Sequence, residues 1–176
     1  MLLSRDDLVS VLFSETDRAQ RLKLPLTLIH IGLADCPNLK SARSKPRHEA
    51  TISSIVERFS RVLRCYDSVG QIADREFVLI LPGCRLFNAK MLAERLRDEV
   101  FGLPFGDCGE EMQLNACFGV VSSGGRSALV VLREAERALQ RARTTEPSLI
   151  HCFGSEDELD PAVFLMPVLE DGSLHW

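Results

Sequence analysis

The chain has 176 residues, of which 45% are hydrophobic and 26% charged, and its formal net charge is −4. These values are typical of one globular domain that can bury a core. No apolar run reaches the roughly 18 residues of a transmembrane helix, and no clustered basic face of the kind that binds duplex nucleic acid is evident. We therefore expect a domain that contacts neither a membrane nor a nucleic acid.

Hydrophobic periodicity predicts helices that alternate with strands along most of the chain. Apolar residues repeat about every 3.6 positions in each expected helix, and short apolar runs bounded by turn residues mark the strands. In chain order we expect a helix at 4–23, a strand at 26–31, a helix around 52–63, strands at 66–72 and 75–82, a helix at 86–100, a strand at 112–122, a helix at 127–143 and a strand at 148–153. This order predicts an α/β fold in which helices cover the faces of a sheet.

The end of the chain differs in composition from the rest. Residues 155–176 hold six acidic side chains and no Lys or Arg, and they include an apolar stretch at 160–169 and the final Trp176. We interpret residues 1–154 as one domain and 155–176 as an acidic and apolar C-terminal tail. This tail could dock on its own domain, complete a dimer or contact a partner.

The cysteines and the first residues indicate the cellular compartment. The six cysteines are scattered without a Cys-x-x-Cys pair, and several, such as Cys117, lie in apolar runs, so buried and reduced thiols are expected. Residues 1–7 turn acidic too early for a signal peptide. Both features favour a cytoplasmic protein. The four histidines show no spacing typical of a metal site, and no cofactor is expected.

The most informative segment surrounds the expected hairpin. An Arg-Cys-Tyr-Asp sequence at residues 64–67 is followed, after five residues, by Ala-Asp-Arg-Glu-Phe at 73–77 and by an apolar run that ends in Leu81-Pro82. This arrangement resembles the GGDEF domain, the family of bacterial diguanylate cyclases. In that family an Arg-x-x-Asp pair, five residues and the signature Gly-Gly-Asp/Glu-Glu-Phe precede a strand that ends in Leu-Pro. Only the last two letters of the signature are kept here.

The resemblance runs from about residue 6 to 153 and includes several further segments. Leu-Ala-Glu-Arg-Leu-Arg at 92–97 and Phe-Gly-Val at 118–120 match it, and residues 135–143 are similar to the family's Ala-Asp-x-Ala-Leu-Tyr-x-Ala-Lys. It implies a GGDEF fold, with a central, mainly antiparallel sheet, a ferredoxin-like βαββαβ core and an N-terminal helix. The family's N-terminal Leu-Thr-Gly-Leu-x-Asn-Arg segment is missing.

The resemblance also implies that the cyclase reaction is lost. Joining two GTP molecules requires divalent metal, which prefers hard oxygen ligands. The family supplies one carboxylate from the end of its first strand and another from the third signature position, and these positions align with His30 and Arg75. An imidazole is a poor Mg²⁺ ligand and a guanidinium cannot ligate. The retained Glu76 cannot hold a metal pair alone.

Other nucleotide-binding positions change as well. The two glycines that let the backbone approach the phosphates are replaced by Ala73 and Asp74. The guanine-reading Asn aligns with Asn38, but its Asp partner falls at Arg47. Arg143 keeps a cation where the family has a phosphate-contacting Lys. We therefore predict a protein that is not an enzyme and holds no metal.

Two interpretations of the new arginines stay open. Arg75 and Arg47 could replace the charge of the metal and hold a nucleotide without Mg²⁺. The plainer interpretation is that Arg75 is a solvated residue at the tip of the hairpin.

The Arg-x-x-Asp pair is the family's product-inhibition site for cyclic di-GMP. An arginine fork can bond a guanine edge or a phosphate, and an aspartate accepts from guanine N–H groups. Arg64, Asp67 and Arg95, which matches a second Arg on the following helix, retain all three residues of this site. Alternatively, Arg64 caps its own helix and Asp67 pairs with it on the surface.

The sequence therefore leads to one main prediction with two alternatives. The main prediction is a regulatory receptor for cyclic di-GMP, and because that ligand binds as an intercalated dimer, its site would bridge two surfaces or two copies in a homodimer. The first alternative is a nucleotide-independent module that binds a signalling protein. An active cyclase or GTP-binding enzyme ranks below both.

Overall fold

The computed structural model of the chain describes residues 2–34, 45–105, 112–144 and 149–153. Its elements are β1 (Leu2–Leu3), α1 (Arg5–Leu22), β2 (Leu26–Leu33), α3 (Lys45–Val62), β3 (Ser68–Ala73), β4 (Glu76–Pro82), α4 (Leu86–Leu96), the π-helix η1 (Arg97–Phe101), β5 (Ala116–Ser122), α5 (Ala128–Thr144) and β6 (Ile150–Phe153). The predicted order of helices and strands is confirmed from α1 onward. None of the helices in these ranges is long and apolar enough to cross a membrane.

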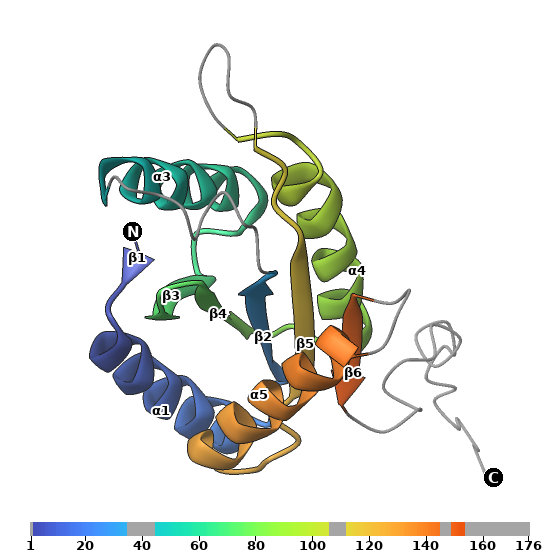
Figure 1. The fold of residues 1–176 in the computed structure, drawn as a ribbon. Coiled ribbons are helices and arrows are strands. Elements are labelled where there is room, and N and C mark those ends of the chain that lie inside the picture. Colours follow the sequence, from blue (N-terminus) through green and yellow to red (C-terminus); the bar gives the residue numbers. More distant parts are fainter. Residues whose placement is uncertain (1, 35–44, 106–111, 145–148, 154–176) are drawn as a thin grey trace, which may run out of the picture.

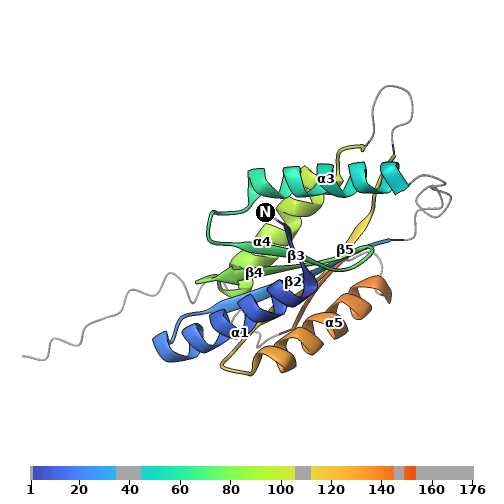
Figure 2. The same cartoon turned by 90° about the vertical axis from the view of Figure 1, so that its left-hand side faces the viewer.

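The strands form one six-stranded sheet in the order β1-β3-β4-β2-β5-β6. The four central strands pair antiparallel, while β1 runs parallel to β3 and β6 runs parallel to β5. The mainly antiparallel sheet expected from the sequence is thus confirmed. Helices α3 and α4 cover one face, and α1 and α5 cover the other (Figures 1 and 2).

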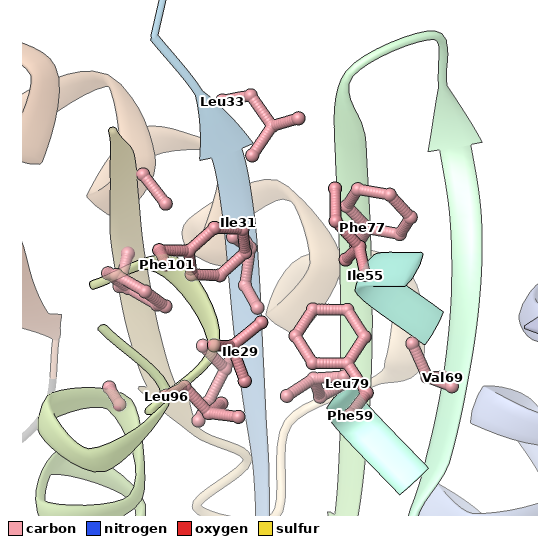
Figure 3. Close-up of a cluster of buried hydrophobic side chains, with 14 of the residues drawn as sticks. Ile29, Ile31, Leu33, Ile55, Phe59, Val69, Phe77, Leu79, Leu96 and Phe101 are labelled. Carbon is pink, nitrogen blue, oxygen red and sulfur yellow. The ribbon is translucent and has the colours of Figure 1, made fainter. Parts of the chain in front are cut away.

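The central strand β2 shows how the sequence produces these two layers. Every residue of β2 is buried, so its apolar run has no polar side that faces water. Alternate side chains point to opposite faces, and Ile29 and Ile31 pack among residues of α3, β4 and η1 (Figure 3). In this layer the rings of Phe59 and Phe77 meet edge to face, with 5.7 Å between their centroids. Burying each such side chain contributes about 1.5–3 kcal/mol.

The residues of β2 between these positions face the other layer. Leu26 and Leu28 pack into the buried cluster beneath α1 and α5. His30 follows them in the same alternation, and it is therefore carried into the interior as a polar group on a face that is otherwise apolar. The alternation of side chains along β2 therefore places His30 on the face that α1 and α5 cover.

Four features of the fold differ from the expected elements, and the first is that the helix expected around 52–63 already begins at Lys45. The helix predicted to reach residue 100 becomes a π-helix over its last turn, η1. The strand predicted from residue 112 begins at Ala116, and Met112 instead forms an isolated bridge with Phe105. The short edge strand β1 was not predicted, because two residues are too few to show a period of two.

Candidate functional site

The eroded signature forms the tip of the β3–β4 hairpin. A two-residue turn, Asp74 and Arg75, joins the strands, and Ala73 pairs with the first residue of β4. Among the described residues Lys23 is the one non-glycine with a positive φ, so this tip needs no conformation that favours glycine. The hairpin therefore folds with side chains at both positions where the family has glycine.

The tip is held against the end of the neighbouring strand. The backbone N–H of Leu33 donates to the carbonyl of Arg75 over 3.0 Å, and the Gln71 side chain donates to the carbonyl of Asp74 over 3.1 Å. Asp74 is exposed and Arg75 is half-buried, and both make further interactions. Arg75 is thus more enclosed than a fully solvated residue at a hairpin tip.

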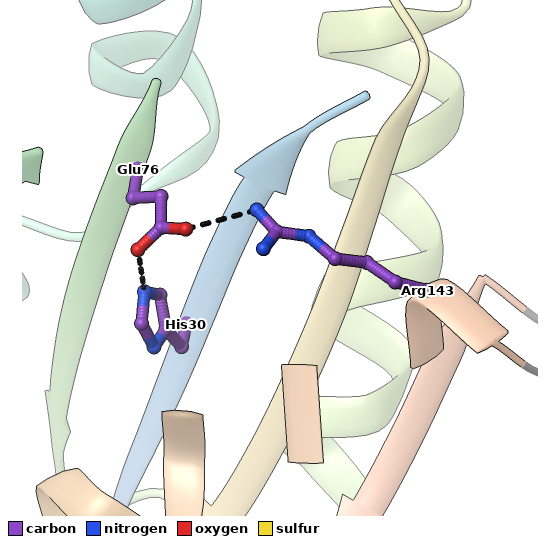
Figure 4. A network of polar contacts seen from close by, with 3 residues as sticks. All are labelled: His30, Glu76 and Arg143. Atoms are coloured by element: carbon purple, nitrogen blue, oxygen red, sulfur yellow. Dashed lines mark hydrogen bonds and ion pairs between the residues drawn. The ribbon is translucent and has the colours of Figure 1, made fainter. Parts of the chain in front are cut away.

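The retained glutamate lies at the centre of a polar network (Figure 4). One carboxylate oxygen of Glu76 lies 3.1 Å from Nε2 of His30, and the other accepts a hydrogen bond of 2.9 Å from the Arg143 guanidinium. His30 is 2% exposed, whereas Glu76 and Arg143 are 24% and 32% exposed. Both oxygens of the carboxylate are therefore engaged within the protein.

The register of the sheet explains how three distant residues meet. Gly32 of β2 pairs with Glu76 of β4, and His30 lies two positions away on the same face. Arg143, near the end of α5, crosses β2 at Gly32, where a Cβ atom would collide with its guanidinium. Gly32 is thus a position that shapes the network, and the sequence analysis missed it because its role depends on a contact with a helix far along the chain.

The electrostatics of the network favour a neutral histidine. Burial lowers the pKa of His30 below its ordinary value, and the Glu76 carboxylate only partly opposes this effect. The Nδ1 atom of His30 is buried without a hydrogen-bond partner, which fits a ring whose Nε2–H donates to Glu76. The charge of Glu76 is then balanced by Arg143, and the network ties the hairpin tip to α5.

These residues do not fit the pair of divalent ions that the resemblance implies. Mg²⁺ needs several hard oxygen ligands, but the aligned positions hold His30 and Arg75, and Glu76 is already bound on both oxygens. Within the described ranges no three or more His, Cys, Asp or Glu residues are grouped so that they could hold a metal ion. Two predicted positions are not placed, because Asn38 lies outside the described residues and Arg47 lies in α3 without a described side chain.

The Arg-x-x-Asp pair forms a turn directly after α3. The backbone N–H of Asp67 donates to the carbonyl of Arg64 over 3.1 Å, and the backbone N–H of Arg64 donates to the Asp67 carboxylate over 2.8 Å. The Arg64 guanidinium instead donates to the hydroxyl of Tyr66 over 2.8 Å. Asp67 therefore closes the turn through the backbone, and the Arg64 side chain is turned toward an exposed ring.

The third predicted residue approaches the same turn from α4. The Arg95 guanidinium donates to the carbonyl of Val62, the last residue of α3, over 3.0 Å. Arg64, Asp67 and Arg95 all line one groove of about 630 Å³ between α3 and α4. The structure thus brings the three residues together around one open space.

The groove contains charges that the sequence analysis did not identify. Besides Asp67, three carboxylates from α4 and η1 line it, namely Glu94, Asp98 and Glu99, so that acids outnumber the two arginines. Burial raises the pKa of Asp67, and burial together with the charge of Asp67 raises the pKa of the Cys84 thiol to about 11. Cys84 is therefore a thiol at neutral pH and contributes no negative charge.

Known proteins resemble this chain in both sequence and fold. A curated diguanylate cyclase from Vibrio cholerae is 23% identical over 126 residues, which cover 72% of this chain and 39% of that protein. The chain spans less than half the length of the curated relatives it matches. The diguanylate cyclase SiaD from Pseudomonas aeruginosa, solved with its activator SiaC, has a TM-score of 0.77 at 25% identity, covering 88% of this chain and 59% of that one.

A third comparison concerns the fold alone. The GGDEF domain of DgcB from Caulobacter crescentus, solved with c-di-GMP, has a TM-score of 0.77 at 15% identity, covering 86% of this chain and 91% of that one. The family model described as the diguanylate cyclase GGDEF domain matches residues 1–148. That range contains the hairpin, the network around Glu76 and the groove between α3 and α4. The chain therefore belongs to the GGDEF domain family.

Proposed function

We propose that this chain is a non-catalytic GGDEF signalling protein that binds cyclic di-GMP through Arg64, Asp67 and Arg95. The observation that carries the proposal is the convergence of these three side chains on one groove of about 630 Å³. Cyclic di-GMP presents guanine edges and phosphates, which suit two guanidinium forks and one carboxylate. A GGDEF domain solved with c-di-GMP shares this fold.

Each of the three residues has a group available to a ligand. The Arg64 guanidinium lies on the surface and donates one hydrogen bond to the Tyr66 hydroxyl, so its other N–H groups can meet a ligand. Asp67 uses one carboxylate oxygen for the turn. Arg95 uses one nitrogen for the Val62 carbonyl, and its side chain lines the groove.

The network around Glu76 supports the proposed absence of catalysis. The metal that the reaction needs would have to displace Arg143 and ligate beside a buried imidazole and Arg75. We therefore expect the purified chain, incubated with GTP and Mg²⁺, to form no cyclic di-GMP detectable by liquid chromatography. Product formation, or a rise in melting temperature with GTP and Mg²⁺, would show instead that the nucleotide site is retained.

Titration calorimetry tests the receptor proposal directly. The chain is titrated with cyclic di-GMP, and we expect micromolar binding that Arg64→Ala weakens roughly tenfold to a hundredfold. Arg61→Ala is the matched control, because Arg61 is an exposed arginine at the same helix end that pairs with Glu57 and does not line the groove. Equal binding in both variants would place the ligand elsewhere, and no binding to the parent chain would reject the proposal.

A second candidate function is binding of a signalling protein without a nucleotide. The observation that favours it is the excess of carboxylates in the groove, since Glu94, Asp98 and Glu99 disfavour a ligand with two phosphates and favour a basic partner. A related cyclase was solved with an activator protein. Calorimetry that shows no cyclic di-GMP binding, together with partner capture that depends on Glu94 and Glu99, would support this candidate over the first.

A further inference from the structure

A second hollow, of about 350 Å³, lies at the end of the sheet where β2 begins and β4 ends. Its lining is mainly apolar and includes Ala19, Leu24, Leu26, Tyr66 and Pro82. Leu24 and Tyr66 are 48% and 53% exposed, and Leu22, which is 57% exposed, lies two residues before Leu24. Large apolar side chains gathered around a hollow are unusual on a bare surface and indicate that something covers it.

We propose that this hollow binds the apolar part of the chain's own C-terminal tail, residues 163–169. The first argument is where the chain leaves the described fold. Phe153, the last residue of β6, pairs with Val121 of β5. Ser123 lies two residues after Val121, and its backbone N–H donates to the carbonyl of Leu26, which lines the hollow. The tail therefore starts at the same end of the sheet as the hollow.

The side chain of Phe153 points to the correct layer as well. It packs against the buried cluster beneath α1 and α5, and that cluster contains Ala19 and Leu26 of the hollow. A chain that continues from Phe153 thus begins beside the floor of the hollow and does not have to pass through the sheet.

The tail is long enough to reach. Three strand spacings, from β6 through β5 and β2 to β4, correspond to roughly 15 Å in the observed strand order. The nine residues 154–162 can span about 30 Å when extended. The apolar residues from 163 onward can therefore lie over the hollow without strain in the connection.

The chemistry of the two surfaces is complementary. Residues 163–169 are apolar apart from their backbone, and acidic side chains flank them on both sides. Arg18 lines the hollow but pairs with Glu15, which lines it too, and Arg21 pairs with Asp17, so that Lys23 adds a net positive charge at the end of α1. Apolar contact would supply most of the attraction, and Lys23 would favour an acidic flank over a basic one.

A tryptophan placed in the tail tests the proposal in the full-length chain. Trp176 is the single tryptophan, so Phe164→Trp combined with Trp176→Phe gives one reporter within the apolar stretch. We expect its emission to be shifted to the blue and protected from acrylamide, compared with the same protein in urea. Leu24→Asp should abolish both effects, and the matched control Leu103→Asp, at an equally exposed leucine outside the hollow, should leave them unchanged.

Two further measurements keep the test decisive. If Leu24→Asp unfolds the protein, Leu165→Asp changes the tail instead of the hollow and should cause the same loss of the shift. The blue shift should also persist on dilution, because docking within one chain does not depend on concentration. A shift that disappears on dilution would assign the hollow to a second copy, and solvent-like emission or equal effects of Leu24→Asp and Leu103→Asp would overturn the proposal.

Discussion

The guanidinium of Arg143 occupies the place above Gly32 where a side chain would otherwise stand. Because Gly32 pairs with Glu76 across the strands, this gap lets α5 reach the signature glutamate. The glycine and the arginine therefore act as one unit that fixes the hairpin tip to the helix layer.

Substitution of Gly32 should cost less than substitution of Gly119, another close-packed glycine. A Cβ at Gly32 meets mainly the flexible end of Arg143, which can move away and lose its bond to Glu76, at a cost of about 1 kcal/mol. A Cβ at Gly119 meets the backbone of α5 at Ala135 and Leu139, and displacing the helix should cost roughly 3 kcal/mol. Urea denaturation of Gly32→Ala and Gly119→Ala checks the order, and equal costs would contradict it.

The stability of the domain should fall as the pH is lowered, in part because of His30. Burial lowers the pKa of His30 in the folded state below its ordinary value of 6.5. The unfolded chain therefore binds the proton first, and stability that is present above pH 6.5 is lost as the pH falls through the lowered pKa. His30→Gln removes the titrating group and should flatten the curve of unfolding free energy against pH.

The pH experiment needs a control because His151 acts in the same direction. Burial and the charge of Arg141 also lower the pKa of His151. His151→Gln, measured over the same pH range, should flatten the curve less than His30→Gln, since His30 is the more deeply buried. A larger effect at His151 would show that the network around Glu76 does not control the acid response.

Arg58 should stabilise the π-helix η1. Its guanidinium donates to the carbonyls of Val100, Leu103 and Pro104 over 2.7–2.9 Å and lies over the ring of Phe105 at 3.8 Å from the centroid. Arg58→Ala leaves these carbonyls without that donor and should lower the unfolding free energy by about 2 kcal/mol. Arg58→Lys should restore only part of it, because an ammonium lacks the planar fork. Full rescue by lysine would mean that charge alone matters.

Substitution of Arg95 should affect both ligand binding and stability, whereas substitution of Arg64 should affect binding alone. Arg95→Ala removes the donor to the Val62 carbonyl, so it should lower the unfolding free energy by about 1 kcal/mol and also weaken cyclic di-GMP binding. Arg64→Ala removes a surface contact with Tyr66 and should weaken binding without shifting the midpoint of thermal unfolding. Calorimetry and thermal unfolding of both variants check this, and the opposite pattern would mean that Arg64 is structural.

The sequence predicted the layers of the fold because each helix and strand carries its own period. The buried stripes of α3 and α5 and the apolar run of β2 are local patterns, and the structure follows them. The π-helix η1 could not be predicted in this way, because Val100 and Phe101 fit an ordinary helix equally well. Its geometry accompanies carbonyl contacts to Arg58, far upstream in the chain.

At the candidate site, too, some residues could be predicted from the sequence and others could not. Alignment with the family predicted that Arg64, Asp67 and Arg95 belong to one site, and in the structure they line one groove. The alignment treated His30 and Arg143 as unrelated, the first as a lost metal ligand and the second as a retained cation. Their common partner Glu76 became visible only with the strand register and the end of α5 in place. Contacts among three elements have no signature in a single sequence.

Tyr66 has a consequence for how the domain could transmit a signal. Its hydroxyl accepts a hydrogen bond from Arg64, which lines the groove, and its own side chain lines the hollow. A ligand in the groove and a segment in the hollow would therefore contact the same aromatic ring. If the two prefer different positions of the ring, binding of one weakens binding of the other, and the coupling free energy is the same in both directions. The domain would in this way gain an output that needs no reaction, because ligand concentration would be converted into release or retention of a peptide segment.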